Sequence, residues 1–127
     1  MVKSIEIHTC DWNFAHTSDR VELKIENSKR ECNTHQLSNG ENFDHGDVDI
    51  FNDKATLNDC FHWPILDSNI TVTVSKWGTD GWAFCWAKII TNNSKIYYCE
   101  NTNNYDLDDG NPKSIAMACV PEGMYTR

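Results

Sequence analysis

A strictly alternating segment that runs into a glycine turn is the feature that most constrains how this chain can fold. In Ile70–Ser75, Val72 and Val74 alternate with threonines, which is the period-2 pattern of a half-buried β-strand. The following Gly78–Gly81 contains glycine and aspartate, residues that tolerate the backbone dihedrals of tight turns. We therefore predict that the fold is organised around a β-hairpin spanning Ile70–Ile90.

The second strand of this hairpin carries a row of aromatic residues. Its alternate positions place three of them on one face: Trp82, Phe84 and Trp86. A buried aromatic side chain removes about 150–250 Å² of surface from water. We expect these three rings, together with Val72 and Val74, to form the centre of the hydrophobic core.

Short alternating segments elsewhere predict a fold built from β-strands. In one of them Val48 and Ile50 are expected to point into the core, whereas Asp53–Asn69 is expected to hold one short helix or an irregular crossing. About eight short strands without helical periodicity favour an all-β sandwich or barrel. The further strands expected are Ser4–Thr9, Asp19–Asn27, Glu31–Leu37, Asp47–Asn52, Ile96–Cys99 and Ser114–Val120.

Length and charge set further bounds. The chain has 127 residues, which fits one domain, and we expect residues 1–127 to form a single one. Its 19 acidic and 11 basic residues give a net charge of −8, and the lysines and arginines are scattered. Nucleic-acid binding needs clustered positive charge, so nucleic acid is not an expected partner. No run of about 18 apolar residues is present, so no transmembrane segment is expected.

Six widely spaced cysteines predict a disulfide framework. No Cys-x-x-Cys pair is present, so three disulfides are expected in place of a zinc cluster, with 15 possible connectivities. Within those alternatives we favour Cys60 with Cys85, because the first precedes the hairpin and the second lies in it. The remaining four would then pair as Cys10 with Cys119 and Cys32 with Cys99.

Two sequons point to the same cellular environment as the cysteines. Asn69-Ile70-Thr71 and Asn92-Asn93-Ser94 are acceptor sequences for N-glycosylation, so Asn69 and Asn92 are predicted glycosylation sites. Disulfides persist in oxidising compartments. We therefore expect a secreted, extracellular glycoprotein.

Four segments in order resemble one known family. Ala15–Leu23 is similar to a Gly-Thr-Asp loop and the strand after it, and Asn42–Phe51 is similar to a Phe-Glu-Arg-Gly-x-x-Asp-x-Phe segment. Ile70–Ile90 is similar to a strand, glycine turn, tryptophan and following strand, and Tyr97–Asp109 to a late aromatic-cysteine strand and the segment after it. Together these segments resemble the PLAT, or lipoxygenase-homology, domain.

The resemblance implies a fold and a class of function. The fold would be an antiparallel β-sandwich of two four-stranded sheets. Members bind lipid surfaces or partner proteins, often with calcium at the loops of one end, and the fold itself supplies no catalysis. A shared fold does not fix function, so these implications are expectations.

Oxygen-bearing side chains near the expected loops are candidate calcium ligands. Calcium takes about six to eight oxygen ligands, mostly from carboxylates and carbonyls. Where the family has Gly-Thr-Asp, this chain has His16-Thr17-Ser18, which removes a carboxylate and adds a β-carbon. Aspartate is also common in turns because it hydrogen-bonds locally, so solvated turn residues are the alternative. The candidate ligands are Asp19, Asn39, Asp44 and Asp80.

Two tryptophans in or beside expected loops are candidate contact residues. Trp12 lies in the first loop and Trp77 flanks the hairpin turn. Tryptophan suits a lipid–water boundary because its apolar ring carries one donor. The alternative is that both rings cover the end of the sandwich.

Motifs of hydrolytic enzymes are absent from the sequence. The chain has no Gly-x-Ser-x-Gly elbow and no His-Glu-x-x-His motif, so no catalytic residue is predicted. The leading hypothesis is a secreted, non-catalytic module that binds a partner protein or a lipid surface through its end loops. A carbohydrate-binding, lectin-like sandwich and a small secreted toxin or hydrolase are the alternatives.

Overall fold

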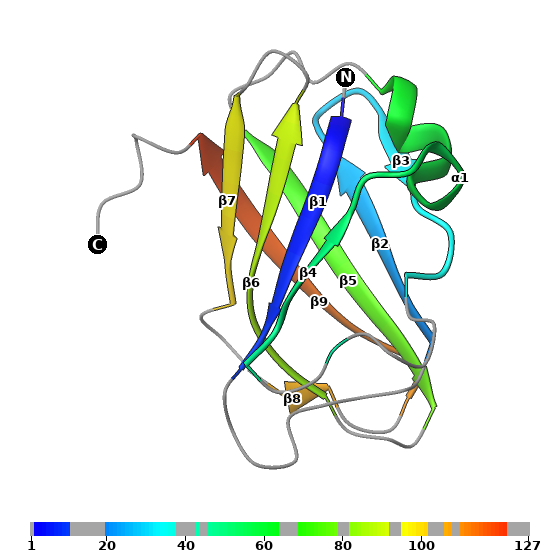
Figure 1. Ribbon diagram of the computed structural model, residues 1–127, viewed down its shortest axis with the longest axis vertical. Coiled ribbons are helices and arrows are strands. Elements are labelled where there is room, and N and C mark those ends of the chain that lie inside the picture. The colour runs from blue at the N-terminus through cyan, green and yellow to red at the C-terminus, as the bar shows by residue number, and fades with distance from the viewer. Residues whose placement is uncertain are drawn as a thin grey trace.

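The computed structural model describes residues 2–10, 20–37, 43, 46–63, 69–78, 82–91, 95–101, 106–107 and 110–121 (Figure 1). Two short helical segments, α1 (Lys54–Leu57) and the 3₁₀ helix η1 (Asn58–His62), lie between β4 and β5. Across these ranges, no helix has the length and apolar character needed to cross a membrane. The strands are β1 (Val2–Thr9), β2 (Arg20–Glu26), β3 (Glu31–Asn33), β4 (Val48–Phe51), β5 (Ile70–Gly78), β6 (Trp82–Thr91), β7 (Ile96–Glu100), β8 (Asp106–Leu107) and β9 (Gly110–Pro121).

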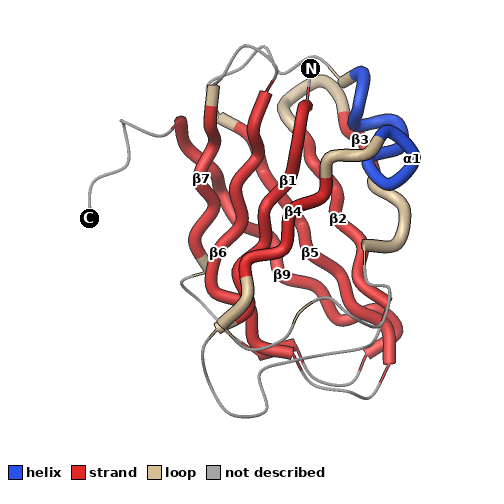
Figure 2. The backbone as a smooth tube through the Cα atoms, in the orientation of Figure 1, coloured by secondary structure: helices blue, strands red, loops and turns tan. Residues whose placement is uncertain are grey.

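The strands form one antiparallel sheet, in agreement with the predicted all-β class. Their order is β3-β2-β5-β9-β7-β6-β1-β4, with β8 added beside β6, and the sheet curls into a half-barrel (Figure 2). Two separate four-stranded sheets are not confirmed, because β7 pairs with β9 over a short register from Tyr97↔Pro121 to Cys99↔Cys119. That pairing joins the two groups of four strands into one sheet.

The predicted central hairpin is wrong. β5 pairs with β2 and β9, whereas β6 pairs with β1, β7 and β8. β5 and β6 therefore belong to different halves of the sheet although they follow one another in the chain. The alternation predicted for β5 is confirmed, with Val72 and Val74 buried, but strand pairing depends on which other strands lie beside each one, and local alternation does not determine that.

A β-bulge in β6 overturns the expected position of one tryptophan. Thr9 is opposite Phe84 but His8 is opposite Trp86, so Cys85 is an extra residue on β6. An extra residue reverses the alternation of the side chains that follow it. Trp82 and Phe84 are buried in the core as predicted, whereas Trp86 lies half-buried on the outer face.

Asn101 satisfies the backbone groups at this bulge. Its side-chain Nδ2 donates to the Phe84 carbonyl at 2.9 Å, and its backbone N–H donates to the Cys85 carbonyl at 3.0 Å. Asn101 is fully buried. An unpaired buried carbonyl costs free energy, so these two hydrogen bonds from Asn101 offset the loss of regular strand pairing at the bulge.

The inward orientation predicted for Val48 and Ile50 is also wrong. Their side chains are 44% and 60% exposed, and Phe51 is the buried member of β4. The register pairs Phe51 with buried Ile5, and residues directly opposite in an antiparallel pair share a face. β4 has apolar residues on both faces, and its register with β1 places Phe51 on the core side.

Phe43, from the segment that resembles the Phe-Glu-Arg-Gly motif, packs against the inner face of β4. Phe43 is fully buried, with its ring centroid 4.8 Å from that of Trp82 and 5.8 Å from that of Phe51. Its backbone has φ 68°, and its N–H donates to the Asp49 carboxylate at 2.7 Å. Gly46 has φ 79°, a value that favours glycine. An aromatic residue at position 43 therefore fills the core, glycine at position 46 fits the positive φ, and the carboxylate at position 49 bonds to the backbone of Phe43.

Three disulfides are present as predicted, but all three favoured pairings are wrong. The bonds join Cys10 to Cys85, Cys32 to Cys60, and Cys99 to Cys119, and no cysteine is free. Cys60 lies on η1, which packs against β3, and β5 and β6 form no hairpin that would bring Cys85 to it. Cys99 and Cys119 face one another across β7 and β9.

Candidate functional site

Most of the residues predicted from the loops cannot be placed. Asp19, Asn39, Asp44, Asp80, Trp12 and Asn92 lie outside the described residues. Among the residues that the structure does describe, no group of three or more histidines, cysteines, aspartates or glutamates is arranged to hold a metal ion. The calcium site therefore stays a prediction.

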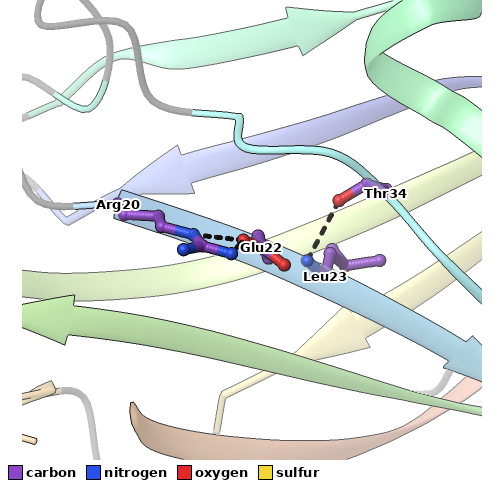
Figure 3. Close-up of polar contacts among 4 residues, drawn as sticks. All are labelled: Arg20, Glu22, Leu23 and Thr34. Atoms are coloured by element: carbon purple, nitrogen blue, oxygen red, sulfur yellow. Dashed lines mark hydrogen bonds and ion pairs between the residues drawn. The ribbon is translucent and has the colours of Figure 1, made fainter. Parts of the chain in front are cut away.

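Trp77, the other predicted contact residue, is half-buried, and a cation covers one face of its ring. Arg20 is opposite Trp77 in the β2–β5 register, and its guanidinium carbon lies 4.7 Å from the ring centroid. Figure 3 shows that Arg20 also reaches Glu22 along β2, with which it forms an ion pair. An arginine over a tryptophan ring is a favourable cation–π contact. One face of the Trp77 ring is therefore covered by the Arg20 side chain within the protein.

Asn69 is exposed directly before β5. It lies on a groove of about 700 Å³ at the ends of β2, β5 and β9, with Glu26, Ser28, Thr71 and Val120 among its lining residues. Glycosylation requires an accessible acceptor, and this position provides one. The modification itself stays a prediction.

An aromatic cluster covers the outer face of β1, β6 and β7. His8 and Trp86 have ring centroids 5.1 Å apart, and those of Trp86 and Tyr98 are 6.1 Å apart. The Lys88 ammonium lies 5.3 Å from the Trp86 centroid. We call His8, Trp86, Tyr98 and Lys88 the outer aromatic face. Val48 of β4 is opposite His8, so the apolar surface continues onto the last strand of the sheet.

The backbone of β4 is paired on one side only. The Thr9 N–H donates to the Asp47 carbonyl at 3.0 Å, and antiparallel pairs alternate between bonded and non-bonded positions. By the register of β1 and β4, Val48 and Ile50 are at the non-bonded positions, so their N–H and C=O groups point away from β1. Within the described part of the chain these groups have no partner. We call Val48 and Ile50, with these groups, the β4 edge.

The opposite end of the sheet is covered at Asn33. Asn33 of β3 also points its backbone groups away from the neighbouring strand, but its N–H donates to the Asp59 carboxylate at 2.9 Å. Its carbonyl accepts from the Asn58 side chain at 3.1 Å. The Cys32–Cys60 disulfide holds η1 against this strand. We call Asn33 and these contacts the β3 edge.

Carboxylates flank β4. Residues 46–53 include Asp47, Asp49 and Asp53 and contain no lysine or arginine. Asp47 and Asp53 are exposed, and Asp49 is half-buried against Phe43. Hydrogen bonds from the Thr56 hydroxyl and N–H hold the pKa of Asp53 below its ordinary value. Segment 46–53 is therefore negatively charged at neutral pH, and the exposed Lys54 follows it directly.

Comparison with known proteins gives similarity in structure only. No family model matches the sequence, and no curated protein matches it significantly. Two crystal structures of a deletion variant of a lipoxygenase, one of them in complex with arachidonate, superpose with a TM-score of 0.66 at 16% sequence identity. The alignment covers 93% of this chain but only 16% of the lipoxygenase chain. The shared feature is the fold of a small part of that enzyme, consistent with its PLAT domain.

The exposed residues of this site were missed by sequence reasoning for identifiable reasons. The bulge that moves Trp86 outward leaves no local signature in an aromatic strand. For Val48 and Ile50 a signal was present, because Phe51 lies at the opposite parity and a short strand with apolar residues on both faces can bury only one of them. To predict that β4 is an edge strand, one must also know the strand order, which places β4 last.

Proposed function

We propose that this chain is a secreted, glycosylated, non-catalytic binding module of the PLAT type that contacts a partner protein. The observation that carries the proposal is the exposure of Val48 and Ile50 on an edge strand whose outward backbone groups are unpaired in the described part of the chain, since exposed apolar side chains on an open edge mark interaction sites. Three disulfides support an extracellular location. The two layers of the proposed sandwich are β3-β2-β5-β9 and β7-β6-β1-β4.

The likeness to a lipoxygenase supports the absence of catalysis in this proposal. The matched region is 16% of the lipoxygenase chain, a portion that corresponds to its PLAT-like part and not to the whole enzyme. A module of this size, matched over 93% of its own length, is proposed to bind and not to react.

A lipid surface is a second candidate partner, favoured by the same structural likeness, because one matched lipoxygenase was solved with arachidonate. In this version Trp12 and Trp77 contact the lipid, and Asp19, Asn39, Asp44 and Asp80 hold calcium between the protein and anionic headgroups. The net charge of −8 opposes direct attraction to such headgroups, so calcium would be required.

A paired experiment separates the two candidates. The oxidised protein is presented to an array of purified extracellular proteins, and in parallel to phosphatidylcholine and phosphatidylserine vesicles with calcium or with a chelator. Binding to a protein on the array that is weakened by Ile50→Lys supports the leading proposal. Vesicle binding in calcium alone, unaffected by Ile50→Lys, supports the lipid version, and no binding in any arm overturns both.

A further inference from the structure

We infer that the β4 edge accepts an extended, basic segment of a partner protein as an additional β-strand. This deepens the proposed function and rests on it, because it specifies the surface and the chemistry of the protein partner. The inference depends on three properties of β4: its unpaired backbone, its exposed apolar side chains and its acidic surroundings.

The backbone of the β4 edge offers a template for pairing. Val48 and Ile50 each present one N–H and one C=O group away from β1. An added strand can bond to all of these groups without disturbing the existing ladder, since that ladder uses the alternate residues. In recognition by strand addition, such main-chain bonds provide affinity and the alternate side chains provide specificity.

The side chains of the edge specify apolar residues in the partner. Val48 is 44% exposed and Ile50 is 60% exposed, and both lie on the outer face of the sheet. Residues of an added strand directly opposite them would share that face and pack against them. Val48 is also opposite His8, so an apolar partner residue there would continue the outer aromatic face.

The charge around the edge specifies basic residues at the alternate positions. Asp47 and Asp53 are exposed beyond the two ends of β4, and Lys54, directly after Asp53, is the first positive charge that follows the strand. Lysine or arginine at the partner position opposite Asp47, or just beyond the end of β4 near Asp53, would complement these carboxylates. Complementary charge of this kind favours the right partner and speeds its encounter.

A second copy of this chain fits the edge poorly. In the antiparallel register that places Val48 opposite Ile50 of a second β4, which bonds all the outward groups of both residues, Asp49 lies opposite its own copy. Like charges directly opposite in a sheet are destabilising. The same electrostatics that favour a basic peptide therefore oppose self-pairing.

The β3 edge shows that the fold contains the means to close an edge. At β3 the outward N–H and C=O of Asn33 are both taken by side chains of η1. Proteins commonly block edge strands in such ways because open edges pair with other chains. β4 lacks an equivalent cover among the described residues and presents branched apolar side chains instead.

The test uses the full oxidised protein and a fluorescent peptide of alternating lysine and valine. Binding is measured by fluorescence anisotropy, and the site is mapped from amide exchange and chemical shifts of Val48 and Ile50. A glutamate–valine peptide of the same length tests charge, and a lysine–valine peptide with N-methylated backbone tests main-chain bonding. The inference predicts binding of the first peptide alone, with added protection at Val48 and Ile50.

Ile50→Pro removes one outward N–H and leaves the β1 ladder intact, because edge strands tolerate proline where the N–H faces outward. We expect it to weaken binding about tenfold, the effect of about 1.4 kcal/mol. Glu31→Pro makes the matched change at the first residue of β3 and should leave affinity within about twofold. Ile50→Lys, a surface change, tests the same site should the proline variant fail to fold.

Equal affinity of the wild type and both Ile50 variants, no binding of the lysine–valine peptide, or a dimer in sedimentation that Ile50→Pro abolishes would overturn the inference. If the protein array still yields a partner in any of these cases, the proposed function survives and only the mode of binding is rejected. If the array yields none, the proposed function fails independently of the peptide result.

Discussion

The two edge strands of this sheet, β3 and β4, both point backbone N–H and C=O groups away from their neighbouring strands. The two edges differ in whether side chains from elsewhere in the chain bond to those groups. At β3, Asp59 and Asn58 bond to the outward groups of Asn33, and a disulfide fastens η1 alongside. At β4, the outward groups of Val48 and Ile50 have no such cover in the described part of the chain. The contrast indicates that an unpaired edge is not an unavoidable result of this topology.

The difference extends to what lies beneath each strand. β4 rests on Phe43, whose ring joins Phe51 and Trp82 in the core, so its position depends on apolar packing. β3 is three residues long and is held by polar contacts and by Cys32–Cys60. An edge supported by a packed core can stay ordered while one side of its backbone is open.

Phe43→Ala should have the largest effect, because it removes the packing under β4. The side chain is fully buried, and deletion of a buried phenylalanine costs about 3–5 kcal/mol of unfolding free energy. Urea denaturation measures the change. Val48→Ala, on the exposed face of the same strand, should change stability by less than about 0.5 kcal/mol. Similar losses in the two variants would show that β4 is not organised by its inner face.

Removal of the Cys32–Cys60 bond should rank next. Its sequence separation is 28, for which the chain-entropy model gives a stabilisation of about 3–4 kcal/mol. The variant Cys32→Ala/Cys60→Ala should unfold at correspondingly lower urea. We also expect its Asn33 amide to exchange rapidly with solvent, because η1 is no longer fastened to β3. An unchanged exchange rate would mean that the polar contacts alone hold the cover in place.

Asp59→Ala tests the hydrogen bond that covers the Asn33 N–H, and it should lower the unfolding free energy by less than the two preceding changes. It removes the acceptor of the Asn33 N–H, an exposed bond worth about 1 kcal/mol. Amide exchange at Asn33 should rise toward the rates at Val48 and Ile50, which should already be fast in the wild type. Slow exchange at Val48 and Ile50 in the wild type would contradict the description of β4 as an open edge.

Asp53→Ala should have the smallest effect, since it alters the start of the helical segment that joins the two edges. Asp53 caps α1 by accepting from the Thr56 N–H and hydroxyl at 2.9 and 2.7 Å. Loss of an N-cap costs about 0.5–2 kcal/mol, and we expect the low end for this exposed, four-residue helix.

The Asp53 contribution should depend on pH in a definite direction. Because the pKa of Asp53 is lowered by folding, its contribution is fully present above the unfolded pKa, near 4, and is lost as pH falls through the folded pKa. The stability difference between wild type and Asp53→Ala, followed by urea denaturation from pH 7 downward, should therefore shrink under acid. A difference that is constant with pH would rule out the carboxylate as its source.

Strand existence was predictable from local pattern, as two segments show. In β2, Val21, Leu23 and Ile25 alternate with charged residues, and in β5 Val72 and Val74 alternate with threonines. In both strands the apolar set is buried. A single half-buried face is a property of a strand by itself, so it can be read without knowing the neighbours.

Local pattern did not predict which strands pair with one another, or on which face of the sheet every side chain lies. The predicted β5–β6 hairpin is wrong because β5 pairs with β2 and β9, and β6 pairs with distant β1 and with the following strand β7. The disulfide pairings that assumed this hairpin are wrong for the same reason. The orientation of Trp86 depends on one extra residue at Cys85. The β4 edge is a consequence of strand order, and the contact of Arg20 with Trp77 is a consequence of register, so neither site feature was accessible from local sequence.

The pairing of β1 with β6 has a consequence for the timing of folding. β1 is the first strand of the sequence, and its Val2 lies opposite Thr91. On a ribosome, β1 therefore waits until β2 to β5 have been synthesised before its longer partner, β6, is made, whereas β4 is available earlier. Sheets dominated by such distant pairings fold slowly. The Cys10–Cys85 bond must also form late, after β6 has emerged, which makes it a marker for completed assembly of this half of the molecule.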